Sequence, residues 1–178
     1  GSKRHVYNET YKTWLNWFDG VVFTDNGLYM AREFETGWQQ IYFLSYDGKT
    51  FRRLTDGPNW NVAIVRVDEK KGDVYYTAKR DAVAKQALYK VDKKGVITAL
   101  TDPAYNATGI IFSPDGKYFV ASLSNMTTPT KIAVIANKGG VVSDGKTNIC
   151  AYPSTSDKTG MLWDAVETDT KPVKYPAV

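Results

Sequence analysis

The chain has one histidine, His5, which lies close to its first residue. Acyl transfer by a serine nucleophile needs a histidine that takes the serine proton and an aspartate that orients it, and the serine commonly lies in a Gly-Xaa-Ser-Xaa-Gly turn. The sequence contains no such turn. Because residues near a terminus are commonly frayed, we expect the side chain of His5 to be solvated. The sequence therefore predicts no catalytic residue within this chain.

Side chains that could hold a metal ion or a phosphate are few. One histidine and one cysteine, Cys150, cannot supply the three or four nitrogen and sulfur ligands that zinc prefers. Asp68-Glu69, and Asp164 with Glu167, lack the spacing of a calcium-binding loop, so we interpret both as solvated loop charges. Gly139-Gly140 has no Lys-Ser/Thr after it and is interpreted as a turn. We predict neither a metal nor a cofactor.

Charge and composition limit the partners. The net charge of +4 comes from 23 basic and 19 acidic residues without a long basic run, so the basic patch of a nucleic-acid-binding protein is missing. No apolar stretch approaches the roughly 18 residues that span a bilayer. With 43% apolar and 13% aromatic residues the chain can fill a core, and the aromatic content favours strands. We expect a soluble β-protein that binds no nucleic acid.

Two kinds of segment recur along the chain and indicate the elements. IYFLSYDGKTFRRLTDG begins at Ile41, and LYKVDKKGVITALTDPA begins 47 residues later at Leu88. Asn26-Gly27, Lys71-Gly72 and Asp115-Gly116 each precede an apolar and aromatic run, and their glycines are 45 and 44 residues apart. A period near 45 with several short strands is typical of β-propeller blades.

The predicted fold is therefore all-β, a partial β-propeller of about three four-stranded antiparallel blades. The blades are expected over about 14–55, 60–101 and 105–149. Gly48, Gly95 and Gly116 are expected in hairpin turns, because glycine adopts positive φ without steric cost. Residues 1–13 are interpreted as a tag remnant and lead-in, since Gly-Ser is typical of a cleavage scar, and residues 151–178 as a linker.

A propeller usually closes with 4 to 8 blades. Three blades leave two sheet faces uncovered, so the sequence predicts that the missing blades come from a longer chain or from association of copies, a possible homo-oligomer.

Several segments match one family in their order along the chain. They are GWQQIY at residues 37–42, LTDG at 54–57 with Trp60 and Val62 after it, VYY at 74–76, LYKVD at 88–92 and FSPDGKY at 112–118. Over roughly residues 14 to 135 the sequence resembles the propeller of prolyl oligopeptidase-type serine peptidases, in particular the dipeptidyl peptidase IV branch. SNMTTP at 124–129 resembles a stretch in the last blade of that branch, so these blades are expected to be the final ones.

The resemblance implies a parent serine peptidase that removes a short N-terminal unit from peptides, often after proline. This chain would gate and position peptide substrates for an α/β-hydrolase domain of the same chain. KYPAV at residues 174–178 resembles the first strand of that domain. A periplasmic or extracellular location is also implied. Nothing here matches the family's amine-anchoring acidic pair, so the substrate-binding residues are unknown.

Charged and aromatic side chains have a structural and a functional interpretation. Arg32 and Glu33 fall where the family has a Ser-Glu-Arg-Asp-like stretch, and we expect them to form salt bridges between blades. Flat apolar rings could stack on a sugar or a peptide, but packing between blades is the favoured interpretation for the five tryptophans. They are Trp14, Trp17, Trp38, Trp60 and Trp163.

Two other functions stay open. Three blades could pair into a closed six-bladed ring that binds a partner protein, making a stand-alone module that closes by self-association. Periplasmic, translocation-associated propellers also use the Ser-Pro-Asp-Gly-Lys turn and bind proteins without cleaving them. Those propellers usually repeat the turn in every blade, whereas here the full turn occurs only at residues 113–117.

Overall fold

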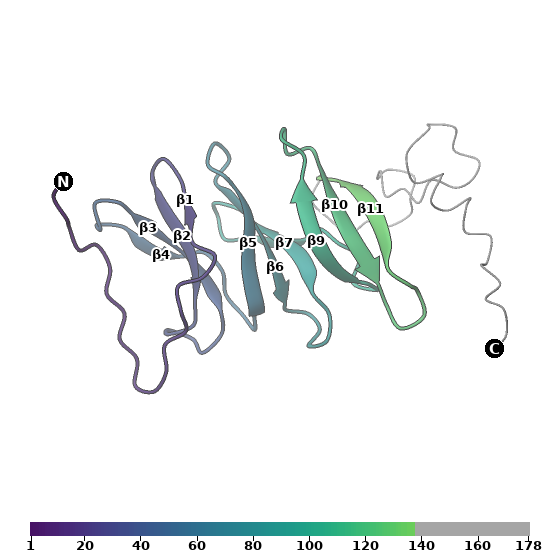
Figure 1. Cartoon of the computed structure of the whole chain (residues 1–178), viewed down its shortest axis with the longest axis horizontal. Helices are drawn as coiled ribbons and strands as arrows, with labels where there is room; N and C mark the ends of the chain where they lie inside the picture. Colours follow the sequence, from purple (N-terminus) through teal and green to yellow (C-terminus); the bar gives the residue numbers. More distant parts are fainter. Residues whose placement is uncertain (138–178) are drawn as a thin grey trace.

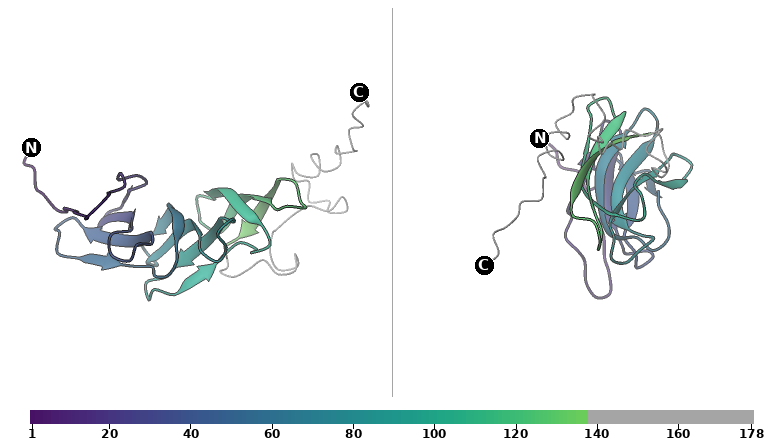
Figure 2. Two further views of the ribbon diagram at one scale, coloured as in Figure 1. Left: turned by 90° about the horizontal axis from the view of Figure 1, so that it is seen from below. Right: turned by 90° about the vertical axis from the view of Figure 1, so that its right-hand side faces the viewer.

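The computed structural model describes residues 1–137, and all regular secondary structure in that part of the chain consists of β-strands. The strands form three antiparallel sheets that follow one another in chain order along the longest axis of the molecule (Figure 1). Figure 2 shows the same succession from below, and from one end the sheets lie behind one another. This arrangement confirms the predicted all-β class and the partial propeller. The described part contains no helix long and apolar enough to cross a membrane.

Each sheet is built from strands in their order along the chain. The first sheet contains β1 (Val22–Phe23), β2 (Gly27–Arg32), β3 (Gln40–Ser45) and β4 (Phe51–Arg53). The second sheet contains β5 (Trp60–Asp68), β6 (Asp73–Lys79), β7 (Ala87–Val91) and β8 (Ile97–Ala99). The third sheet contains β9 (Asn106–Phe112), β10 (Tyr118–Ser124) and β11 (Lys131–Ala136). The fourth strand predicted for this sheet falls after Ala136, outside the described residues.

The second sheet is buried on both faces. Successive side chains of a strand point to opposite faces, and in β6 Val74 and Tyr76 pack against the first sheet while Tyr75 packs against the third. Phe119 of β10 lies in the same cluster as Tyr75. Because both faces are covered, five consecutive residues of β6 are buried, which explains why this strand has no alternation of polar and apolar residues in the sequence.

The N-terminal lead-in, which in the structure extends over residues 1–21 and not only over the predicted 1–13, covers the outer face of the first sheet. Tyr7 and Val21 pack against a small core formed by Met30, Tyr42 and Leu44. Figure 1 shows the lead-in descending past this sheet and returning to β1. Residues 1–21 contain no strand, yet they bury apolar side chains that the first sheet would otherwise expose to water.

The predicted glycine turns are present. Gly48 and Gly116 have φ of 74° and 69°, in the left-handed region that glycine adopts most easily. In the β9–β10 turn, the Ser113 hydroxyl donates to Asp115 Oδ1 at 2.7 Å, and the Lys117 N–H donates to the same oxygen at 3.0 Å. The side chain of Asp115 therefore closes the turn that glycine begins, and an equivalent pair of bonds closes the β3–β4 turn on Asp47.

Candidate functional site

Several residues considered for chemistry lie apart or outside the described chain. His5 is exposed in the lead-in. Residues 1–137 contain no group of three or more His, Cys, Asp or Glu side chains placed to hold a metal ion. The positions that lie beyond the described residues are Gly139-Gly140, Cys150, Trp163, Asp164, Glu167 and residues 174–178.

Glu69 has a different role from the one predicted. We expected a solvated charge, but its carboxylate accepts hydrogen bonds from the backbone N–H of Asp25 at 3.1 Å and from the side chain of Asn26 at 3.2 Å. Bonds from Thr24 and from these two residues lower the pKa of Glu69. Glu69 therefore ties the β5–β6 turn to the β1–β2 turn of the preceding sheet, a contact between residues too far apart in the chain for local patterns to indicate.

Arg32 does not form a salt bridge between blades, and that prediction was wrong. Its guanidinium pairs with Glu9 of the lead-in through two bonds, Nε to Oε2 at 2.7 Å and Nη2 to Oε1 at 3.0 Å. It also donates to the carbonyl oxygens of Asn16 and Trp17 and lies 4.3 Å from the Phe18 ring centroid. Arg32 is only 2% exposed. The paired charges hold the lead-in on the first sheet.

Glu33 likewise contacts the lead-in. Its Oε1 accepts a hydrogen bond from the side chain of Asn16, while its Oε2 is buried without a hydrogen-bond partner. Arg32, the last residue of β2, and Glu33, which follows it, thus both act within the first sheet and its lead-in.

The four tryptophans that the structure describes are not buried in the core as we predicted, although one pair does pack between two sheets. Trp14 and Trp17 are exposed in the lead-in, Trp60 is 54% exposed and Trp38 is 36% exposed. Trp38 and Trp60 do meet between the first and second sheets, with ring centroids 5.1 Å apart and an interplanar angle of 85°. Asn61 has φ of 51° and the β5–β6 register shifts after Trp60, so the strand's alternation does not continue to Trp60. That irregularity leaves its ring near the surface.

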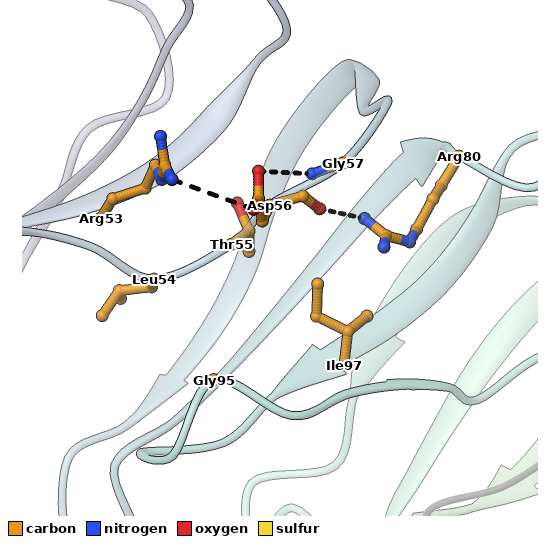
Figure 3. Close-up of a pocket in the computed structure, with 8 residues that line it drawn as sticks. All are labelled: Arg53, Leu54, Thr55, Asp56, Gly57, Arg80, Gly95 and Ile97. Atoms are coloured by element: carbon orange, nitrogen blue, oxygen red, sulfur yellow. Dashed lines mark hydrogen bonds and ion pairs between the residues drawn. The ribbon is translucent and has the colours of Figure 1, made fainter. Parts of the chain in front are cut away.

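An open hollow lies where the end of the first sheet meets the second sheet (Figure 3). Its volume is about 640 Å³, and it is lined by Arg53, Leu54, Thr55, Asp56, Gly57, Arg80, Gly95 and Ile97. Asp56 is central: its Oδ1 accepts from the Gly57 N–H at 2.9 Å, its carbonyl oxygen accepts from Arg80, and its carboxylate lies 3.9 Å from Arg53.

The charges of this hollow largely satisfy one another. Arg53 also pairs with Glu35 at 3.2 Å, and Arg80 donates to Asn59 Oδ1 at 3.0 Å. The lining contains neither a histidine nor a cysteine, and its one hydroxyl, that of Thr55, is buried and donates to the Gln40 amide oxygen rather than to a base. Its geometry suits cohesion between two sheets better than chemistry on a substrate.

Sequence reasoning missed a buried polar network beside this hollow. Gln40 Oε1 accepts from the Thr55 hydroxyl and from Asn59 Nδ2, both at 2.8 Å, and all three residues are buried. Thr55 belongs to the repeated Leu-Thr-Asp and could have been found from that signal. Neither Gln40 nor Asn59 recurs in the next unit, so no periodic signal indicates these two residues. The same holds for Glu9, the partner of Arg32, because Glu9 lies outside the repeats.

Comparison with known proteins connects this fold to a family. The family model described as the dipeptidyl peptidase IV (DPP IV) N-terminal region matches residues 1–130. Dipeptidyl peptidase 4 of Trichophyton rubrum is 30% identical over 96 residues, which are 53% of this chain and 12% of that protein. The chain thus spans about an eighth of the length of the curated relatives it matches.

Solved structures share the arrangement of sheets. The crystal structure of Porphyromonas gingivalis dipeptidyl peptidase 4 matches with a TM-score of 0.59 and 28% identity, over 72% of this chain and 18% of that one. TolB from Acinetobacter baumannii matches with a TM-score of 0.55 and 18% identity, over 68% of this chain and 31% of that one, a likeness of fold alone. The match of the family model to residues 1–130 shows that the chain belongs to the family of the dipeptidyl peptidase IV N-terminal region.

Proposed function

We propose that this chain is the propeller portion of a dipeptidyl peptidase IV-like serine exopeptidase, where it gates and positions peptide substrates for an α/β-hydrolase domain. The observation that carries the proposal is the family match over residues 1–130, supported by the 30% identity to a protein named dipeptidyl peptidase 4. The parent protein would release N-terminal dipeptides, often after proline. A periplasmic or extracellular location is part of the same proposal.

The first strands of the sheets support a gating role. β1, β5 and β9 each pair with one strand only, so each presents a free edge within the described part of the chain. β5 also approaches β9, which places the first strands of the second and third sheets near each other, while β5 approaches β2 of the first sheet. In a radial array of blades such strands surround the central channel. A channel of fixed width would admit an unfolded peptide and exclude a folded protein.

The roles proposed for the propeller and for the hydrolase domain follow from the catalytic groups that this sequence lacks. Hydrolysis by a serine peptidase needs a nucleophile, a base and an orienting acid, and this chain has no Gly-Xaa-Ser-Xaa-Gly turn and a single exposed histidine. The proposal therefore assigns the reacting groups to the hydrolase domain and assigns binding, orientation and exclusion of large substrates to the propeller.

The experiment is to read the source reading frame on both sides of this chain, to express its full product and to assay it. We expect a Gly-Xaa-Ser-Xaa-Gly turn with later Asp and His, and release of p-nitroaniline from an Ala-Pro p-nitroanilide. The same substrate with a blocked N-terminus and the 178-residue chain alone serve as inactive controls. A frame without a hydrolase sequence, or a full product that releases no dipeptides, would overturn the proposal.

Gating is tested on the same product with substrates of increasing size. We expect release of an N-terminal dipeptide from short and medium peptides, and no release from a folded protein with the same N-terminal residues. If the folded protein is processed as fast as its unfolded form, the propeller does not select by size.

A further inference from the structure

The hairpin between β1 and β2 contains Asn26-Gly27, the only Asn-Gly pair of the chain. Asparagine is a chemically labile residue, and it loses its amide most readily before glycine, because glycine has no side chain to hinder attack by its own backbone nitrogen. Asn26 is exposed to water, whereas Gly27 is buried. The hairpin lies beside the β5–β6 hairpin of the second sheet, at the upper edge of Figure 1.

Gly27 is required by the packing of the first sheet. A Cβ at this position would lie 2.8 Å from the ring of Phe43, and it would come closer still to the carbonyl oxygen of Leu44. A larger residue would therefore push β2 away from β3, so the first sheet keeps glycine directly after Asn26.

The reaction of such a pair needs only water. The backbone nitrogen of Gly27 bonds to the side-chain carbonyl carbon of Asn26, the bond from that carbon to Nδ2 breaks, and ammonia leaves with the proton of the backbone nitrogen. The product is a cyclic imide. Water then opens either of its two carbonyl–nitrogen bonds and yields aspartate or isoaspartate. In both products a carboxylate replaces the neutral amide, and its proton passes to the ammonia.

The amide of Asn26 is part of a contact between two sheets. Its Nδ2 donates to Glu69 Oε1 at 3.2 Å, and its backbone N–H donates to the same oxygen at 3.4 Å. A carboxylate in place of this amide loses a donor and brings a second negative charge against Glu69. An open hollow of about 600 Å³ lies at this contact, and four of its lining residues are acidic while two are basic. They are Asp25, Asn26, Arg66, Val67, Asp68, Glu69, Lys70 and Asp115.

We propose that Asn26 is a deamidation site and that its conversion releases the β5–β6 hairpin from the β1–β2 hairpin. Aspartate acts through repulsion of Glu69. Isoaspartate also lengthens the main chain by one methylene just before Gly27, where the tight packing leaves no room for a longer chain. The inference does not depend on the proposed function, because it concerns only the contact between the first two sheets.

The Asp-Gly pairs of two other turns should react more slowly. Aspartate forms the same cyclic imide from its neutral acid, since an ionised carboxylate offers no good leaving group. Hydrogen bonds from a serine hydroxyl, and then from a lysine backbone N–H, lower the pKa of Asp47 and of Asp115. Both carboxylates therefore stay ionised at neutral pH, which makes Asn26 the distinctive site.

Peptide mapping by mass spectrometry tests the site on the folded 178-residue chain, aged at mildly alkaline pH. We expect Asn26 to gain the mass that replaces an amide by an acid before Asn8 does, because Asn8 is exposed but followed by glutamate. Asn26→Gln should abolish the gain, since glutamine would have to form a larger ring. Isoaspartyl methyltransferase should label the aged chain at Asn26 and not at Asp47 or Asp115. An Asn26 that changes no faster than Asn8 would overturn the site.

Asn26→Asp tests the effect, because it carries one product permanently. We expect faster hydrogen exchange in both hairpins and a folding equilibrium constant lowered roughly two- to fivefold, as is typical of an exposed charge pair. Adding Glu69→Gln should recover most of this loss, because it removes the repulsion. Asn61→Asp is the matched control, since Asn61 donates to the amide oxygen of Gln86 and not to a carboxylate. If Glu69→Gln rescues neither variant, or both equally, the proposed release of the hairpins is wrong.

Discussion

Thr55 accepts a hydrogen bond on its hydroxyl oxygen from the backbone N–H of Ile41 at 2.9 Å, and the next sheet repeats this contact between Thr101 and Leu88 at 3.0 Å. Both threonines are buried, and each follows a leucine whose own N–H donates to the carbonyl oxygen of the same residue, Ile41 or Leu88. In both sheets the repeated Leu-Thr-Asp segment therefore joins the end of the fourth strand to the third strand through hydrogen bonds.

Removing this acceptor should destabilise the sheet. Thr55→Val keeps the shape of the side chain but leaves the buried N–H of Ile41 unpaired, which costs about 1–3 kcal/mol. Thr101→Val should cost a similar amount. Urea unfolding followed by fluorescence measures both, with Thr50→Val at an exposed position as the matched control. Variants of Thr55 and Thr101 as stable as the control would show that the contact contributes little.

Arg32 and Glu9 should be strongly coupled. Their side chains are 3% and 5% exposed, so Arg32→Met leaves a buried carboxylate without its cation, a change worth about 3–5 kcal/mol. We expect faster hydrogen exchange and proteolysis across residues 1–21 and lower overall stability.

The double variant Arg32→Met with Glu9→Leu tests the coupling, because it removes both charges and should recover most of the loss. Lys49→Met is the control, since Lys49 pairs with Asp47 on the exposed surface at 3.8 Å. If the double variant is no more stable than Arg32→Met, the loss comes from packing of the arginine stem rather than from the unpaired charge.

The periodic part of this fold was accessible from the sequence. The spacing of Gly27, Gly72 and Gly116 marks the second strand of each sheet, and the Leu-Thr-Asp segments mark the fourth. Both signals arise from hydrogen bonds within one unit, so they recur whenever the unit does. The fold class followed from them, whereas the family was indicated by the resemblance of several segments, among them residues 37–42 and 112–118.

Contacts outside the repeat could not be predicted in this way. Arg32 finds its partner 23 residues earlier, in a lead-in without strands, and nothing in the spacing of charges indicates that choice. Trp60 begins a strand whose register shifts at the next residues, so the prediction from blade geometry gave the wrong exposure for its ring. Such positions depend on local irregularities that only the assembled sheets reveal.

The Asp115 turn should make stability depend on pH at the acidic end. The bonds from the Ser113 hydroxyl and then from the Lys117 N–H lower the pKa of Asp115 from 3.8 to about 2. A carboxylate with a lowered folded pKa contributes stability that is present above 3.8 and is lost as the pH falls towards about 2. Asp115→Asn should therefore reduce the loss of stability over this window.

Unfolding midpoints measured from neutral pH down to that window check this expectation. The pKa of Asp47 is also lowered, first by the Ser45 hydroxyl and then by the Lys49 N–H. Asp47→Asn should change the acid dependence in the same direction, which would tie the effect to the turn geometry. If Asp115→Asn and the parent chain lose stability in parallel, the turn carboxylate does not set the acid limit.

The outer face of the third sheet should behave differently in the chain and in its longer parent. Ile111 is 69% exposed there, whereas Ile135 is 1% exposed and packs towards the second sheet. In the 178-residue chain, Ile111→Lys should change the free energy of unfolding by no more than about 0.5 kcal/mol, while Ile135→Lys should cost roughly 3–5 kcal/mol.

In the full reading-frame product a following blade would cover Ile111, so the same Ile111→Lys change should destabilise that product by roughly 2–4 kcal/mol. Thermal unfolding of both proteins measures the difference, and an Ile111→Lys variant that is harmless in both would mean that no blade packs on this face.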